Sequence, residues 1–292
     1  MRIVVASGKG GTGKTTVSTS LAQVAAEAYS VRFLDCDVEA PNAALFLHPA
    51  LATQREVGIL VPRVDTQACT HCGKCAEVCQ FHAIAVVGQT VLVFDDLCHG
   101  CGSCTLICPE QAISEQLSVI GVIDTGLTPE GIAFAQGVMN VGQAMGVPIL
   151  RELKKWTPEA MPATCDAPRQ PLEIRDAPPG ASCPVVETMR GAEFVLFVTE
   201  PTPFGLHDLK QVAAIAREFD LPAGVVINRD GIGDDAIDTY CAVQNLPILL
   251  RIPLERRIAE ALASGQTLVD AAPEYRTLFK DLLERIVARM NA

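Results

Sequence analysis

The chain has 292 residues, of which 49% are hydrophobic and 20% charged, so it can bury the core of one large or two modest domains. Its net charge of −11 excludes the basic face that a nucleic-acid partner requires. No run of eighteen apolar residues is present, so the sequence predicts no membrane span.

The first elements follow in close succession. Arg2–Ala6 is a β-branched run typical of a buried parallel strand. It leads directly into the glycine-rich turn Gly8–Thr16, which leaves no room for a signal peptide, so we expect a cytoplasmic protein. Residues 14–27 have helical apolar spacing, and residues 31–34 predict the next strand. This order begins a doubly wound α/β sheet.

From about Val61 to Ser114 a cysteine-dense segment interrupts this pattern. It holds two copies of C-x2-C-x2-C-x3-C, 29 residues apart: Cys69, Cys72, Cys75 and Cys79, then Cys98, Cys101, Cys104 and Cys108. This is the spacing of a bacterial ferredoxin with two clusters, in which the fourth cysteine of each run binds the other cluster. The spacing predicts two [4Fe–4S] clusters, one on Cys69, Cys72, Cys75 and Cys108 and one on Cys98, Cys101, Cys104 and Cys79.

Zinc is the competing interpretation, because it also binds C-x2-C pairs. Zinc takes two separated pairs, whereas each run here offers three closely spaced cysteines and a fourth. The nearby histidines exceed the ligand count, and they either tune hydrogen bonding or face solvent: His71, His82 and His99. A segment of about fifty residues is too small to fold without its metal.

The remaining chain returns to the alternating pattern. Residues 117–141 predict strands or a hairpin, followed by a helix near 147–156 and a proline-rich loop over 157–171. Four further strands are predicted at 172–175, 194–198, 223–227 and 248–252, with helices at 185–190, 206–219, 234–244 and 273–290. The predicted fold is therefore α/β, a doubly wound and mostly parallel sheet (1–60 and 115–292) with an inserted small α+β domain (61–114).

The turn after the first strand meets the phosphate-loop pattern G-x4-G-K-[ST]. In such loops the backbone N–H groups and the helix N-terminus cradle phosphates. Lys14 is expected to reach the β- and γ-phosphates, and the Thr15 hydroxyl to coordinate Mg²⁺. The predicted nucleotide-binding residues are Gly10, Gly11, Thr12, Gly13, Lys14, Thr15 and Thr16.

The form of this loop, K-G-G-x-G-K-T-T, resembles the deviant Walker ATPases, which include MinD, ParA, the scaffold ATPases of iron–sulfur assembly and the nitrogenase iron protein. The resemblance implies an ATP-sandwich dimer in which Lys9 acts in trans on the partner's nucleotide, as an arginine finger would. The partner is either a second copy of the chain or a related ATPase.

The same resemblance assigns roles to carboxylates after two strands. Asp37 is expected to position the attacking water, and Asp35 to lie near the Mg²⁺ shell. Asp176 would hold Mg²⁺ through water, and the N–H of Gly180 would sense the γ-phosphate. Each of the three aspartates could instead be a turn or cap residue. The charged residues of 172–175 interrupt the usual hydrophobic pattern, so we expect that strand to be partly exposed.

Two further residues match the family's base-binding positions. By resemblance Asn228 contacts adenine and Pro253 lies near the base. A turn role is the alternative for Asn228. The guanine-specific pattern N-K-x-D is not met because position 231 is glycine, so ATP is favoured over GTP.

Cys183 lies seven residues after Asp176, the offset at which the nitrogenase iron protein has a cysteine that ligates a cluster shared across its dimer. The resemblance makes Cys183 a candidate metal or redox contact, with Cys165 as the nearby second thiolate. The alternative is a free thiol packed beside the loop. Cys36 is expected to be a small buried side chain.

The stretch Thr199–Asp208 resembles the matching loop of MinD-superfamily ATPases that carry an inserted ferredoxin domain. Three functions remain open: an ATP-driven redox switch that passes electrons to a partner, a carrier that delivers an iron–sulfur or metal cofactor to an acceptor protein, and a MinD-like positioning ATPase. We favour the redox switch because each cluster has its full ligand set. Positioning usually needs a membrane-binding tail, whereas the last helix is better suited to packing on the sheet through Leu278, Leu282, Ile286 and Met290.

Overall fold

A computed structural model describes residues 1–158 and 169–291. Its centre is a nine-stranded sheet with the strand order β11-β10-β9-β1-β8-β2-β7-β6-β3. The seven strands from β11 to β7 run parallel: β1 (Arg2–Ala6), β2 (Ser30–Asp35), β7 (Ala133–Met139), β8 (Pro171–Asp176), β9 (Phe194–Thr199), β10 (Ala223–Asp230) and β11 (Ile248–Pro253). Two antiparallel strands complete one edge: β6 (Ile113–Leu127) and β3 (Ala50–Val64). The predicted α/β fold with a mostly parallel sheet is confirmed.

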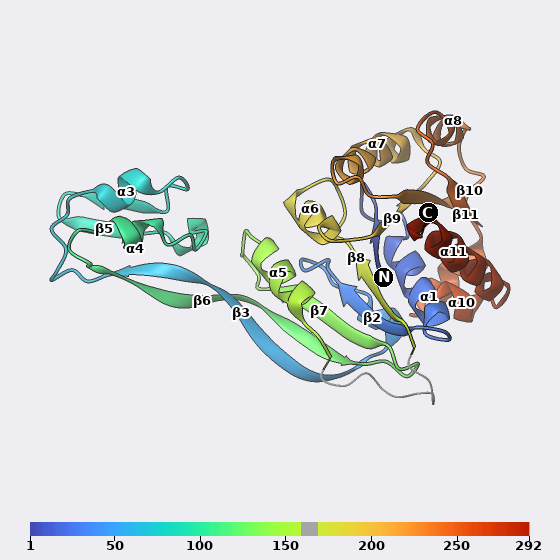
Figure 1. Cartoon of the computed structure of the whole chain (residues 1–292), viewed down its shortest axis with the longest axis horizontal. Coiled ribbons are helices and arrows are strands. Elements are labelled where there is room, and N and C mark those ends of the chain that lie inside the picture. The colour runs from blue at the N-terminus through green and yellow to red at the C-terminus, as the bar shows by residue number, and fades with distance from the viewer. Residues whose placement is uncertain (159–168, 292) are drawn as a thin grey trace.

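Helices cover both faces of the parallel strands, as Figure 1 shows. One face packs against α1 (Lys14–Ala25), α2 (Ala44–Leu47), α9 (Arg256–Ala263), α10 (Leu268–Ala271) and α11 (Glu274–Met290). The other packs against α5 (Val147–Lys155), α6 (Cys183–Met189), α7 (Pro203–Glu218) and α8 (Ala236–Val243). Parallel strands buried on both faces explain the continuous hydrophobic runs in β1 and β9.

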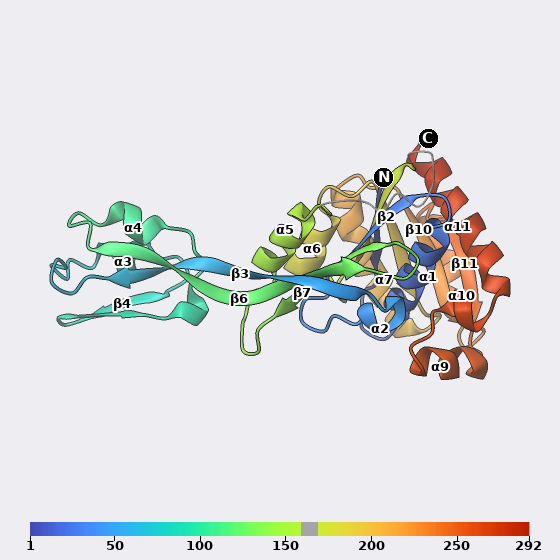
Figure 2. The ribbon, with the colours of Figure 1, turned by 90° about the horizontal axis from the view of Figure 1, so that it is seen from below.

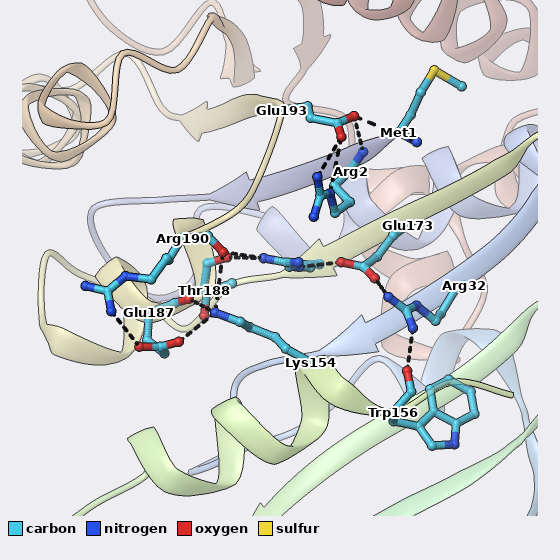
Figure 3. A network of polar contacts seen from close by, with 11 residues as sticks. Met1, Arg2, Arg32, Lys154, Trp156, Glu173, Glu187, Thr188, Arg190 and Glu193 are labelled. Atoms are coloured by element: carbon cyan, nitrogen blue, oxygen red, sulfur yellow. Dashed lines mark hydrogen bonds and ion pairs between the residues drawn. The ribbon is translucent and has the colours of Figure 1, made fainter.

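Strand β8 is buried between β1 and β2, so the expectation that it is partly exposed is wrong. Its charged side chains are satisfied internally (Figure 3). Arg175 donates to Glu173 at 2.6 Å and to the backbone oxygens of Thr188 and Arg190 at 2.8 and 3.0 Å, while Glu173 also pairs with Arg32. Charges can be buried when they are paired, and removing one partner of such a pair costs about 3–5 kcal/mol.

Strands β3 and β6 form a long antiparallel ribbon that leaves the body of the molecule (Figure 2). Ala50 pairs with Leu127 at the body, and Val64 pairs with Ile113 at the far end. The ribbon carries the cysteine-rich module, which contains α3 (Lys74–Val78), β4 (Ile84–Val87), β5 (Thr90–Val93), η1 (Asp95–Leu97) and α4 (Ser103–Ile107). The proposed domain boundaries, after residues 60 and 114, fall inside these continuous strands.

The hairpin expected over 117–141 is present as β6 and β7. Strand β3 and helices α9 and α10 were not predicted, and most of the expected loop 157–171 lies outside the described residues. The last helix packs as expected but through a shifted face, because Leu278 is 41% exposed whereas Tyr275 and Phe279 are buried. Within the described ranges, no helix has the length and apolar character to cross a membrane.

Candidate nucleotide and cluster sites

The predicted nucleotide-binding residues gather at the carboxyl edge of the parallel strands, where α/β sheets bind ligands. The phosphate loop follows β1, and Asp35 and Asp176 end the neighbouring strands β2 and β8. Asn228 lies near the end of β10, and Pro253 ends β11 and is exposed. Tertiary structure therefore brings together residues separated by more than two hundred positions in the chain.

Three side chains with predicted phosphate and magnesium roles contact one another directly. Lys14 donates to one Asp176 oxygen at 3.0 Å, and the Thr15 hydroxyl donates to the other at 2.7 Å. Burial lowers the pKa of Lys14, but the charges of Asp176 and Asp35 outweigh it, so the pKa lies above its ordinary value. The ammonium is therefore held in its charged form, which phosphate binding requires.

Asp35 organises the loop that carries Asp37. One Asp35 oxygen accepts the N–H of Asp37 at 3.1 Å, and the other accepts those of Asn42 and Ala43 at 2.9 Å. Burial raises the pKa of Asp35 to about 7, and the charge of Asp176 acts in the same direction. Burial also raises the pKa of Asp37, which is half-buried. The structural role of Asp35 in this loop was missed from the sequence.

The loop has the shape and the free space that bound phosphates need. Gly11 and Gly13 have φ angles of 77° and 90°, which L side chains rarely adopt. A Cβ added to Gly10, Gly11 or Gly180 would meet no described atom within 4 Å. The buried Thr12 hydroxyl has no hydrogen-bond partner among the described residues, and the Gly180 N–H bonds to Ser7. The free space and the unpartnered Thr12 hydroxyl fit a bound nucleotide, whereas the Gly180 N–H donates to the Ser7 carbonyl and is not free for the predicted contact with the γ-phosphate.

Residues at the ends of β9 and β10 also hold the loop. Asn228 donates to the Thr12 carbonyl at 2.8 Å, and a Cβ at Gly13 would lie 2.2 Å from the Asn228 amide nitrogen. Arg229 donates to the Gly11 carbonyl at 3.2 Å and pairs with Glu200 at 3.0 Å. The contacts of Glu200 and Arg229 with the phosphate loop were not predicted from the sequence. The signal for them was a charged residue near the end of each of two apolar strands.

The eight cysteines of the module line two separate hollows. One is lined by Cys69, Cys72, Cys75 and Cys108 and the other by Cys79, Cys98, Cys101 and Cys104. These are the two ligand sets predicted from the spacing. Among the residues that the structure describes, no three His, Cys, Asp or Glu side chains gather as a site for a metal ion. The four cysteines of each set line the wall of their own hollow.

The two hollows lie in sequence along the ribbon. Val64 and Ile113, which form the last pair of the ribbon, line the first hollow. Leu60, Pro62 and Glu115 line the second, so it lies nearer the body.

The 29-residue repeat extends to the backbone of the module. The N–H groups of His71 and Ala83 bond to Cys69 and Cys79 sulfurs, and those at positions 100 and 112 bond to Cys98 and Cys108, at 3.3–3.4 Å. Positive φ angles also recur in pairs, at positions 71 and 100, 73 and 102, and 82 and 111. The two halves of the module therefore repeat in backbone conformation and in N–H contacts to sulfur as well as in sequence.

The cysteines outside the module differ in access. Cys183 is exposed at the first position of α6, whereas Cys165 lies outside the described residues. Cys36 is buried, as expected, and burial raises its pKa to about 12. Cys241 is also buried, with its pKa raised to about 11 by the same effect.

Fold and phosphate loop together define a P-loop nucleotide-binding ATPase, and comparison with known families agrees. Residues 3–269 match the model of the CobQ/CobB/MinD/ParA nucleotide-binding domain. The chain belongs to this family.

Two curated relatives come from Methanocaldococcus jannaschii. The uncharacterized protein MJ0579 is 32% identical over 268 residues, which cover 91% of each chain. The uncharacterized protein MJ0578 is 30% identical over 288 residues, 98% of this chain and 96% of the relative.

Solved structures share the fold. The septum site-determining protein MinD of Pyrococcus horikoshii, complexed with Mg-ADP, matches with a TM-score of 0.56 at 19% identity, covering 100% of this chain and 98% of that one. The MinC:MinD cell division complex of Aquifex aeolicus matches with a TM-score of 0.57 at 14% identity, covering 98% of this chain and 95% of that one. A ParA family ATPase of Chlorobium tepidum matches with a TM-score of 0.52 at 13% identity, covering 98% of each chain.

Proposed function

We propose that this ATPase is a nucleotide switch coupled to two [4Fe–4S] clusters that gate electron transfer to a partner protein. The observation that carries the proposal is the pair of four-cysteine hollows, joined by continuous strands to a phosphate-loop body. Each hollow offers four thiolates around a central space, which matches the donor set of a cubane cluster.

In the body, the loop amides and Lys14 would bind the phosphates, and Thr15 and Asp176 would hold Mg²⁺. Asp35 fixes the loop on which Asp37 would orient the attacking water. Lys9 would stabilise the transferring phosphoryl group of the partner's nucleotide. Asn228 and Pro253 would contact the adenine. Cys183, exposed beside this site, is a candidate redox contact between the subunits of a dimer.

In the module, the first hollow would hold one cluster and the second hollow the other. Bound clusters supply reversible one-electron transfer. The chain's own contribution is to hold the sulfurs in place: backbone N–H groups bond to a sulfur at each end of both ligand runs. A redox protein, or an acceptor of the cofactor, is the expected partner.

A path of contacts runs from the nucleotide loop to the ribbon, and Figure 3 shows its middle step, between Lys154 and Glu187. Helix α6 begins directly after the loop that contains Gly180. Lys154 of α5 bonds to the Glu187 carboxylate of α6 at 2.6 Å. Helix α5 in turn packs Ile149, Leu150 and Leu153 against both ribbon strands. A movement of α6 can therefore be passed to the arm that carries the cysteines.

Two assemblies fit this proposal, a homodimer and a pair of related ATPases. Methanocaldococcus jannaschii has two proteins similar to this chain over nearly its full length. Two similar uncharacterized proteins in one organism support a pair of related chains. The trans role of Lys9 would be possible in either assembly.

The proposal is tested by the midpoint potentials of the clusters, measured by anaerobic EPR titration with MgADP and with a non-hydrolysable MgATP analogue. A shift between the two states is expected, because coupled sites change each other's equilibria. Equal potentials in the two states would overturn the coupling.

A MinD-like positioning ATPase is the second candidate, and the comparisons favour it over electron transfer. The solved neighbours are MinD and ParA proteins, and their names refer to cell division and ATPases. A third candidate, cofactor delivery, predicts loss of iron to an acceptor. Iron analysis before and after turnover separates delivery from both other functions, because an electron carrier retains its iron.

A further inference from the structure

The ammonium of Lys9 is engaged within its own subunit. It pairs with one carboxylate oxygen of Glu200, which lies just beyond the end of β9. The other Glu200 oxygen accepts from Arg229 at 3.0 Å. The Glu200 side chain is only 7% exposed, so its charge must be compensated inside the protein.

The two cations of Glu200 are not equivalent. Arg229 is fixed a second time, by its bond to the Gly11 carbonyl, and sits at a φ of 55°. Lys9 has one charged partner and is 33% exposed, so its side chain is accessible from outside the subunit. If Lys9 leaves, Arg229 still neutralises Glu200. The contact between Lys9 and Glu200 can therefore open without stranding a buried charge.

We infer that Glu200 is a positioning residue that holds Lys9 in its own subunit until a nucleotide-loaded partner competes for it. The inference rests on the proposed role of Lys9 in trans. A triphosphate with Mg²⁺ carries more negative charge than one carboxylate and attracts the ammonium more strongly at contact distance. Glu200 thus sets how much partner is needed before hydrolysis begins, and limits hydrolysis by the isolated subunit.

The test is the ATPase rate per subunit over a range of protein concentrations, for the full chain with its metal. Glu200→Gln keeps the shape and removes the charge. We expect the concentration that gives half-maximal rate to fall about tenfold, within the range of ordinary coupling energies. The maximal rate at saturating protein reports separately any effect of the change on the phosphate loop, which Glu200 helps to hold through Arg229. Glu193→Gln is the matched control, because Glu193 pairs with Arg2 at the amino ends of the strands, whereas the phosphate loop lies at their carboxyl ends.

A double-mutant cycle separates positioning from general stability. Dimerisation with a non-hydrolysable MgATP analogue is measured by ultracentrifugation in the Lys9→Ala background. Glu200→Gln should have no effect there, because the restrained ammonium is gone. A Glu200→Gln midpoint equal to the wild type, or an effect that persists without Lys9, would overturn the inference.

Arg229→Gln decides the case if Glu200→Gln does not fold. It leaves Glu200 to Lys9 alone, so the half-maximal concentration should rise; an unchanged or lower value would overturn the inference. If Lys9→Ala retains wild-type turnover, the trans role in the proposed function fails. If Lys9→Ala is inactive and Glu200→Gln is unchanged, the restraint alone fails.

Discussion

The ATPase body and the cysteine-rich module are stabilised by different means. The body buries large side chains in a continuous core that includes Phe33, Phe134, Phe194 and Phe279. The main buried cluster of the module consists of Cys75, Ile84, Cys104 and Ile113, and half of these are proposed metal ligands. Burial of apolar surface is sufficient for the body, at about 25 cal/mol per Å². We expect the module to depend on a metal cluster bound by its thiolates, as the proposed function requires.

The difference extends to the surface. The module exposes seven large hydrophobic side chains within residues 65–112, whereas the much longer described part of the body outside the ribbon also exposes seven. A segment this small cannot cover its own hydrophobic residues. The two regions therefore differ in how much of their hydrophobic surface they bury, and they are joined by a ribbon whose strands belong to both.

The largest expected effect is that of iron removal on the module. Anaerobic chelation should unfold residues 65–112, because metal-binding energy is folding energy in small metal domains. Amide exchange there should accelerate about a thousandfold or more, while β1, β8 and β9 keep their protection. Hydrogen exchange with mass spectrometry measures both regions in one sample. A protected module in the iron-free protein would refute its dependence on metal.

Next in size is the loss of turnover in Lys14→Ala and in Asp37→Ala. Removing a group that stabilises or orients the reacting phosphate should lower the ATPase rate at least about a hundredfold. Both variants should keep their full iron content, because the altered residues lie in the body. Lys210→Ala is the control, since Lys210 lies on α7 with its ammonium over the ring of Tyr240. Iron loss from either variant would show that the two regions are not stabilised independently.

A smaller effect is expected from Lys154→Met, which removes the shorter of the two ion pairs that α5 makes with Glu187 of α6. The nucleotide-dependent shift in cluster potential should fall to about half or less, with ATPase activity kept within about twofold. The matched control is Lys155→Met: Lys155 is 70% exposed and pairs only with Glu152 among the ion pairs of the described residues. Equal shifts in both variants would exclude this path.

The smallest effect distinguishes the thiols of the body. Burial disfavours the thiolate, so at pH 8 Cys36 and Cys241, with pKa values of about 12 and about 11, stay protonated. Iodoacetamide should alkylate the exposed Cys183 at least about a hundredfold faster than either. Peptide mapping of native and unfolded protein gives the rates. Alkylation of Cys36 in the native protein would contradict its burial.

Sequence reasoning was strongest where a local pattern carries its own chemistry. The phosphate loop and the β9 strand were placed correctly because spacing and hydrophobic runs are local properties. It failed for β8, where Glu173 and Arg175 suggested exposure. Their partners, Arg32 and the end of α6, are distant in sequence, so the compensation of charge was invisible.

Strand β3 was missed for a similar reason. Residues 50–64 include Pro62, Gly58 and several polar side chains, and only pairing with β6 makes them a strand. Long-range pairing supplies the hydrogen bonds that weak local propensity does not.

By itself the sequence determined the family, the phosphate loop and the division of eight cysteines into two sets of four, because each depends on residue type and spacing. The tertiary structure decided what those residues face. It placed Asp176 against Lys14 and Thr15, and it engaged Lys9 with Glu200. It also ordered the two hollows along the ribbon. Such contacts join charged side chains at the ends of strands that are far apart in the chain, and only the folded sheet brings these side chains close together.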